Sequence, residues 1–127
     1  MKLILDTCAL LWLAASDKRL SRSTFKKINE APAVYVSAIS GFEIALKTAH
    51  GKLDLPDPPR EWFRKIVNHH GLAILPLELD ICIAAAQLPP IHDDPSDRFI
   101  IAAAKAGNLP VVTADERFEA YGVQIFC

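Results

Sequence analysis

The sequence contains only three cysteines, at positions 8, 82 and 127, and no Cys-x-x-Cys pair. An odd number of widely spaced cysteines gives no disulfide framework, so we expect reduced thiols. Long apolar runs are also absent, because Asp6 interrupts the N-terminal one, and the uncharged stretch from Thr7 to Ser16 is about half of the roughly 20 residues that span a bilayer. We therefore expect a soluble, cytoplasmic protein without a secretory leader or a membrane segment.

An excess of charge of either sign is missing as well. The chain has 14 lysines and arginines against 15 aspartates and glutamates, a net charge of -1 and a pI near 6.4. Nucleic acid or an anionic membrane would have to be bound by local basic patches or by bound cations rather than by the overall charge. Hydrophobic residues make up 51% of the 127 residues, which is enough for one domain with a real core over residues 1–127.

Short apolar segments alternate with helical patterns along the chain. The residue pattern predicts strands over residues 2–5, 33–38, 72–77, 109–115 and, at an edge, 122–126, with helices between them. This alternation is typical of an α/β fold, in which a mainly parallel sheet of four or five strands is covered by helices on both faces. Ligands of such sheets bind beyond the carboxyl ends of the strands.

Two of the predicted strands end in an acid. Asp6 follows Leu-Ile-Leu and Asp115 follows Val-Val-Thr-Ala, so both belong to the sheet edge where ligands bind. Asp6 also precedes a helical pattern that contains Leu10 and Leu13, and Asp is a favoured N-cap because its side chain accepts from the free amides of the first turn. A structural cap and a functional carboxylate both remain open for Asp6.

Glu43 borders the predicted buried stripe of its helix. Apolar residues at steps of three and four form that stripe, namely Ile39, Phe42, Leu46 and Ala49. A surface ion pair with Lys47, four residues on, would explain Glu43 without any function, and such pairs contribute only about 0.3 to 0.5 kcal/mol. Both interpretations remain open.

Asp97 lies beside another apolar helix face. That face is formed by Ile100, Ile101 and Ala104. Asp97 also falls in the first turn of a helix that Asp94 would cap and Pro95 would begin, where the helix dipole favours an anion. The position is thus explained either by helix electrostatics or by a site.

The four acids Asp6, Glu43, Asp97 and Asp115 form what we call the acidic quartet, and they are more simply explained together than one by one. Clustered carboxylates repel one another and stay ionised only beside a compensating cation. Oxygen ligands without thiolates select a hard divalent ion, Mg²⁺ or Mn²⁺. A metal held by carboxylates suggests phosphate chemistry, because it activates water and neutralises developing charge.

Four ordered stretches of the chain resemble one protein family. The stretches LILDTCALLW, SAISGFEIALKTAHGKLDL, HDDPSDRFIIAAAKAGNLPVVTAD and YGVQIF are similar to the PIN-domain ribonucleases, most closely the VapC-like toxins of bacterial toxin–antitoxin pairs. The resemblance covers essentially the whole chain as a single PIN-like domain. It implies an α/β/α sandwich and metal-dependent RNA cleavage that leaves 5′-phosphate and 3′-hydroxyl ends. It also implies that the acidic quartet is catalytic and holds one or two Mg²⁺ or Mn²⁺ ions.

Two threonines match hydroxyl positions beside the quartet in this family. Thr7 and Thr113 would orient a water or a carboxylate there. The alternatives are that Thr7 caps a helix and that Thr113 simply ends a strand.

Two charged residues near Asp97 have similarly open roles. Asp94 is either a helix cap or a peripheral contact to metal or water. Arg98 either pairs with the quartet, or contacts a substrate phosphate, or is a solvated helix arginine.

Three positions depart from the residues usual in the family. Cys8 stands where His is often found, Phe42 where Trp is frequent and Ser96 where Phe is usual, so substrate contacts and packing are in doubt rather than the metal centre. We interpret Cys8 as a small residue at the turn, because the spacing identifies no base for a nucleophile. The histidines at positions 50, 69, 70 and 92 show no zinc pattern, and we interpret most of them as surface or capping residues.

The resemblance implies two macromolecular partners, an RNA substrate and an antitoxin whose extended tail fills an apolar groove and covers the metal site. Candidate groove contacts, or else core residues, are Trp12, Trp62 and Phe63. Candidate RNA contacts, or else solubilising charges, are Lys47, Lys52, Arg98 and the patch from Lys18 to Lys27. By analogy we expect a homodimer or a dimer of toxin–antitoxin pairs.

Three other functions fit the sequence less well. A phospho-receiver needs an Asp at the end of the third strand, where this chain has Ile-Leu-Pro-Leu. A haloacid-dehalogenase-like phosphatase needs a second acid two residues after Asp6, where Cys8 stands. An inactive PIN scaffold that only binds a partner is the third, and the intact quartet argues against it.

Overall fold

The computed structural model describes residues 1–127 and alternates strands with helices. In chain order the elements are β1 (Leu3–Leu5), α1 (Thr7–Ala15), α2 (Arg22–Glu30), β2 (Val34–Ser37), α3 (Ala38–Ala49), α4 (Pro59–His70), β3 (Ala73–Leu75), α5 (Leu79–Gln87), α6 (Pro95–Gly107), β4 (Val111–Val112), the 3-10 helix η1 (Glu116–Tyr121) and β5 (Ile125–Phe126). None of these helices is both long and apolar enough to cross a membrane.

All five strands pair in parallel, in the order β3-β2-β1-β4-β5. The predicted parallel sheet and the edge position of the last strand are therefore confirmed. Leu5, the last residue of β1, pairs with Val36 of β2 and with Val112 of β4. Because parallel strands end at the same side of a sheet, the residues that follow β1 and β4 meet at one carboxyl edge.

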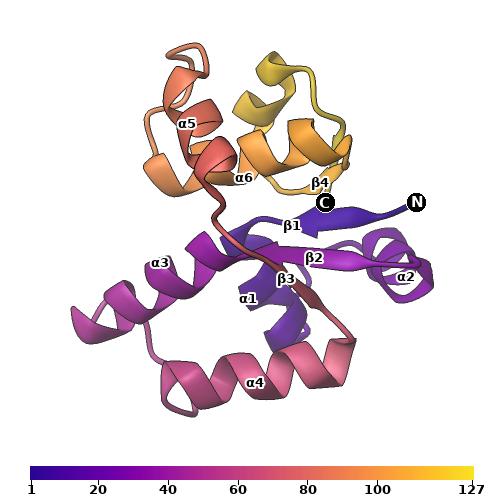
Figure 1. The fold of residues 1–127 in the computed structure, drawn as a ribbon. Coiled ribbons are helices and arrows are strands. Elements are labelled where there is room, and N and C mark those ends of the chain that lie inside the picture. Colours follow the sequence, from indigo (N-terminus) through magenta and orange to yellow (C-terminus); the bar gives the residue numbers. More distant parts are fainter.

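Helices cover both faces of the sheet, with α1 and α4 on one face and α5 and α6 on the other (Figure 1). Side chains alternate along β1, so Leu3 and Leu5 belong to the core under α1 and α4, while Ile4 belongs to the core under α6 and η1. All three are fully buried, as expected for a central strand of a parallel sheet. The buried central strand of the sheet therefore ends directly before Asp6.

Local capping explains where the helices near this edge begin. Asp6 caps α1 by accepting from the backbone N–H of Ala9 at 2.7 Å. Asp94 caps α6, and Pro95 occupies its first turn, where no backbone donor is needed. Both predicted caps are confirmed.

The predicted buried stripe of α3 is confirmed at Ile39 and wrong at Phe42, Leu46 and Ala49. Phe42 is 62% exposed and Leu46 is 42% exposed, whereas the buried residues of α3 are Ile39, Ser40 and Ile44. The far half of α3 extends beyond the sheet (Figure 1), so no core is available to cover the apolar side chains there. Glu43 consequently lies beside buried Ile44, on the inner side of the helix.

Candidate active site

Asp6 is a buried carboxylate at the carboxyl end of the central strand. It is only 6% exposed and uses Oδ1 for the helix cap, while Oδ2 accepts from the Thr113 hydroxyl. Burial raises its pKa above the ordinary value, although the hydrogen bonds from Thr113 and Ala9 oppose the rise. The negative charges of Glu43 and Asp115 raise it further. Asp6 is therefore both a cap and a carboxylate held among other acids.

Asp115 follows β4 and is neutralised by an arginine. Arg117 donates from Nε to Oδ1 at 3.0 Å and from Nη2 to Oδ2 at 2.8 Å, a two-pronged pair with the carboxylate. This pairing lowers the pKa of Asp115 to about 2. Its backbone N–H donates to Thr113 Oγ1 at 3.0 Å, so Thr113 connects the acids that follow β1 and β4. Thr113 thus orients a carboxylate, one of the roles anticipated for it.

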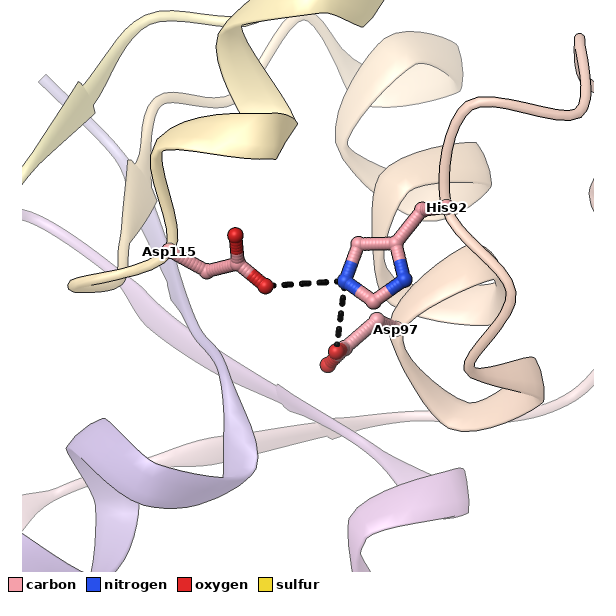
Figure 2. Close-up of side chains that lie close together, drawn as sticks. All are labelled: His92, Asp97 and Asp115. Atoms are coloured by element: carbon pink, nitrogen blue, oxygen red, sulfur yellow. Dashed lines mark hydrogen bonds and ion pairs between the residues drawn. The ribbon is translucent and has the colours of Figure 1, made fainter.

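Asp97 lies in the first turn of α6 next to a buried histidine. Desolvation raises its pKa to about 7, the charge of Asp94 adds to the rise, and His92 opposes it. Oδ2 of Asp97 lies 3.0 Å from His92 Nε2, which also makes a 2.8 Å hydrogen bond to Asp115 Oδ2 (Figure 2). One imidazole nitrogen therefore lies between two acids of the quartet.

His92 is the exception to the prediction that most of the histidines are surface or capping residues, because its side chain is buried. Its side chain is 1% exposed. No zinc-binding sequence pattern includes His92, because the side chains beside its ring are the carboxylates of Asp97 on α6 and Asp115 after β4. The available signal was its place at the start of the HDDPSDR stretch, two residues before Asp94, the N-cap of α6.

Glu43 projects from α3 with its two oxygens in different surroundings. Oε2 pairs with Lys47 Nζ at 3.0 Å, which confirms the predicted ion pair. Oε1 is buried and has no hydrogen-bond partner, and the side chain as a whole is 14% exposed. A buried carboxylate oxygen without a partner is costly and points to an additional cation.

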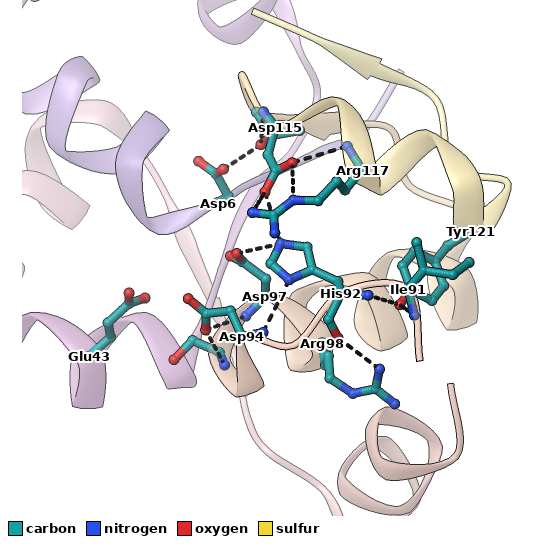
Figure 3. A network of polar contacts seen from close by, with 12 residues as sticks. Asp6, Glu43, Ile91, His92, Asp94, Asp97, Arg98, Asp115, Arg117 and Tyr121 are labelled. Carbon is teal, nitrogen blue, oxygen red and sulfur yellow. Dashed lines mark hydrogen bonds and ion pairs between the residues drawn. The ribbon is translucent and has the colours of Figure 1, made fainter. Parts of the chain in front are cut away.

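The structure brings the acidic quartet to one space at the carboxyl edge of the sheet. Figure 3 shows Asp6, Asp97 and Asp115 around this space, with Glu43 facing it from α3. The charges of Asp6 and Glu43 both raise the pKa of Asp97, which places these acids within electrostatic reach of one another. Their donors are all hard oxygens, which fits Mg²⁺ or Mn²⁺ better than zinc.

The remaining predicted residues have different roles. Thr7 is not the N-cap of α1; its buried hydroxyl bonds instead to Ser40 Oγ at 2.8 Å, which ties α1 to α3. Asp94 accepts through Oδ1 from the N–H groups of Ser96 and Asp97 at 2.9 and 3.4 Å, so it is the cap of α6, and its charge also raises the pKa of Asp97. The Cys8 thiol has its pKa raised by desolvation and then by the charge of Asp6, which disfavours the thiolate.

Arg98 makes no hydrogen bond or ion pair with the quartet, so the predicted pairing with the quartet is wrong. The side chain of Arg98 is partly exposed, and its contact with a substrate phosphate stays a prediction. Its guanidinium donates to backbone carbonyls at the end of α5 and in the loop that follows. The acceptors are the carbonyl oxygens of Ala85, Ala86, Leu88, Pro89 and His92, at 2.7 to 3.4 Å. The arginine that does contact the quartet is Arg117, which the sequence analysis did not single out.

The fold and this acidic edge define the class of protein. The chain belongs to the PIN domain family, whose model matches residues 3–124. Ribonuclease VapC22 of Mycobacterium tuberculosis (strain ATCC 25618 / H37Rv) is 30% identical to it over 120 residues, which are 93% of this chain and 90% of that protein.

Two solved structures show the same fold. VapBC2 from Rickettsia felis, bound to a DNA fragment from its promoter, matches with a TM-score of 0.74 and 14% identity over 99% of this chain and 98% of that one. DNA-bound VapBC from Salmonella typhimurium matches with a TM-score of 0.67 and 20% identity over 99% and 97% of the two chains. The likeness confirms the predicted architecture.

Proposed function

We propose that this protein is a divalent-metal-dependent endoribonuclease and the toxin of a toxin–antitoxin pair. The observation that carries the proposal is the buried, unpartnered Oε1 of Glu43, facing three further carboxylates at the ligand-binding edge of a parallel sheet. A relative named as a ribonuclease supports RNA as the substrate. The named VapBC neighbours support an antitoxin as the partner.

The acidic quartet would hold the cation. When bound, Mg²⁺ or Mn²⁺ neutralises charge at a phosphodiester and lowers the pKa of water. Around it, Thr113 fixes the orientation of Asp6, and Arg117 fixes that of Asp115. Because the net charge of the chain is -1, binding of the RNA backbone depends on local cations. Lys47 and Arg117 are half-exposed or more and lie beside the quartet, so they are the basic residues best placed to contact phosphate.

A groove beside the quartet supports the antitoxin assignment. It runs between α1 and the segment before α4, and its lining includes Cys8, Leu11, Trp12, Leu53, Leu55 and Trp62. Cys8 is two residues from Asp6, so an extended apolar segment in this groove would reach the acidic edge. Of the predicted contacts, Trp12 and Trp62 line this groove, while Phe63 lines a separate hollow near Arg60.

Exposed apolar side chains support self-association. Phe42 and Leu46 on α3 and Leu79 and Ile83 on α5 are all exposed. Large apolar side chains that lie together on a surface are typical of a protein interface, and we propose that these four belong to one. We propose a homodimer, or a dimer of toxin–antitoxin pairs.

The test compares wild type with Asp6→Asn, both freed of antitoxin and shown to be folded by circular dichroism. Asn keeps the oxygen that caps α1 but removes the charge. We expect cleavage of structured RNA by wild type with Mg²⁺ or Mn²⁺, none with EDTA, and a loss of more than about a hundredfold in the variant, beyond what an outer-shell partner costs.

Asp80→Asn, which removes an exposed acid of α5, is the matched control and should cleave as wild type does. Equal cleavage by wild type and Asp6→Asn would contradict the proposal. If neither cleaved any RNA in a broad pool, the protein would act as a binding scaffold.

A further inference from the structure

His92 is fixed from all sides, which is unusual for a loop residue. Its backbone N–H donates to the Tyr121 hydroxyl at 2.7 Å, and its carbonyl accepts from Arg98 at 3.0 Å. Its ring packs edge-on against Phe118, with centroids 5.8 Å apart. Figure 3 shows this network around the ring. These contacts with protein groups therefore set the position of the imidazole.

The hydrogen bonds also fix which ring nitrogen carries the proton. The backbone N–H of Asp94 donates to Nδ1 at 3.1 Å, so Nδ1 offers its lone pair and carries no hydrogen. In a neutral imidazole the proton is then on Nε2. That N–H points to Asp115 Oδ2 at 2.8 Å, with Asp97 Oδ2 3.0 Å away.

This arrangement is the reverse of a metal-binding histidine. A ligating imidazole uses the lone pair of one nitrogen for the metal and donates the N–H of the other to a nearby acceptor. Here the nitrogen near the acids is the donor, and the nitrogen away from them accepts. The ligand atoms of His92, Asp97 and Asp115 lie within 4.8 Å of one another, yet only the two carboxylates have lone pairs to offer a cation there.

We propose that His92 is a positioning residue, which holds Asp97 and Asp115 at the spacing required for a divalent cation without binding that cation itself. The inference rests on the proposed function and adds a residue to it. Asp97 comes from α6 and Asp115 from the segment after β4, so no backbone hydrogen bond sets the distance between them. Without a shared donor the two like charges would move apart.

The first experiment reads the tautomer without any metal. Nitrogen-15 NMR of the imidazole in the wild-type protein, in EDTA at neutral pH, should find His92 with the proton on Nε2 and none on Nδ1. A proton on Nδ1 would overturn the proposal.

The second experiment measures Mn²⁺ affinity from the electron paramagnetic resonance signal of free Mn²⁺. His92→Gln places an amide N–H₂ close to the position of Nε2 and so preserves the donor to both acids, whereas His92→Asn ends near Nδ1 and cannot reach them. We expect His92→Asn to bind Mn²⁺ about 10- to 100-fold more weakly and His92→Gln to bind within about threefold of wild type. His69→Asn makes the same change at an exposed position of α4 and should bind as wild type does.

The outcomes separate the two proposals. Equal Mn²⁺ binding by wild type and by folded His92→Asn overturns the role of His92 and leaves the metal site intact. Coupling of bound Mn²⁺ to an imidazole nitrogen, seen by electron spin echo spectroscopy, also overturns it, because His92 would then be a ligand. No Mn²⁺ binding by wild type overturns both proposals. Rescue by Gln but not by Asn supports the positioning role even where thermal unfolding shows that Asn lowers stability.

Discussion

The acids of the quartet differ in how their charge is balanced. Glu43 and Asp115 pair with half-exposed cations, Lys47 and Arg117. Asp6 and Asp97 have no such partner, and the pKa of each is raised chiefly by burial. The two groups therefore differ in their electrostatics, because the first two carboxylates each have a cation beside them, whereas the second two pay a desolvation cost when ionised.

Asp97→Asn should stabilise the metal-free protein at pH 8. The pKa of Asp97 is about 7 in the folded state against an ordinary value of 3.8, so ionisation costs free energy only when the chain is folded. This cost is absent below about pH 4, grows as the pH rises to about 7, and is complete above it. We expect the free energy of unfolding of the variant at pH 8 to exceed that of wild type by about 1 to 3 kcal/mol, and the difference to vanish near pH 4.

Urea unfolding in EDTA at pH 4, 6 and 8 measures this difference. Asp80→Asn is the control, because Asp80 occupies the first turn of α5 but is exposed. It should show no gain that depends on pH. A constant difference between Asp97→Asn and wild type at all three pH values would be inconsistent with a raised pKa.

At the level of elements, one side chain of α6, that of Arg98, caps the end of α5. The last carbonyls of a helix have no partner within it, and Arg98 from α6 supplies donors to several of those that end α5. The same guanidinium holds the carbonyl of His92. Arg98 therefore acts on the site through the backbone, at a distance from the acids.

Arg98→Lys should lower the free energy of unfolding by about 2 kcal/mol, because an ammonium keeps the charge but cannot replace the planar fork of donors. It should also weaken Mn²⁺ binding, since the loop that carries His92 loses one of its anchors. Urea denaturation measures the first effect. Arg64→Lys on α4, an exposed arginine, should change stability by less than about 0.5 kcal/mol. An unchanged unfolding midpoint for Arg98→Lys would rule out this anchoring role.

The elements that were predictable from the sequence are those in which local pattern and tertiary packing agree. The run Leu-Ile-Leu before Asp6 predicts a buried strand, and the structure has β1 there. Asp94 and Pro95 predict the start of a helix, and α6 begins at these residues. The helical spacing of Phe42 predicts a core position, but apolar spacing alone cannot tell a buried face of a helix from an exposed apolar one, and Phe42 is exposed.

His92, Arg98 and Arg117 could not be assigned because their partners depend on tertiary structure. His92 contacts the carboxylate of Asp115, and Arg98 contacts the carbonyl of Leu88, and both partners come from other elements of the fold. Arg117 contacts Asp115, which is only two residues away. This contact matters for the site only because Asp115 belongs to the quartet. Sequence spacing predicted the acids because strand ends and helix faces are local features, and it missed the residues that balance and position them.

On the scale of the whole molecule, the proposed cation would be part of the stability of the fold. An ion that binds only the folded state stabilises it, by about 2.7 kcal/mol at a concentration 100 times its Kd. The four carboxylates come from four segments, so the unfolded chain offers no comparable site.

Mn²⁺ at that concentration should raise the Tm of wild type by about 10 °C, as measured by circular dichroism at 222 nm. Glu43→Gln should abolish most of this shift, because it removes the charge of the carboxylate whose Oε1 has no partner. Glu61→Gln on α4 changes a half-exposed glutamate and should leave the shift intact. A Tm of wild type that does not respond to Mn²⁺ would refute the cation site.

The central position of β1 has a consequence for the order in which the protein is made. The hydroxyl that holds Asp6 belongs to Thr113, 107 residues later in the chain, and the backbone N–H of Asp6 donates to the carbonyl of Val112. During synthesis Asp6 leaves the ribosome 107 residues before Thr113. A nascent chain that ends before Thr113 lacks both this hydroxyl and Asp115, so the acidic edge cannot exist until β4 and the residues after it have been made.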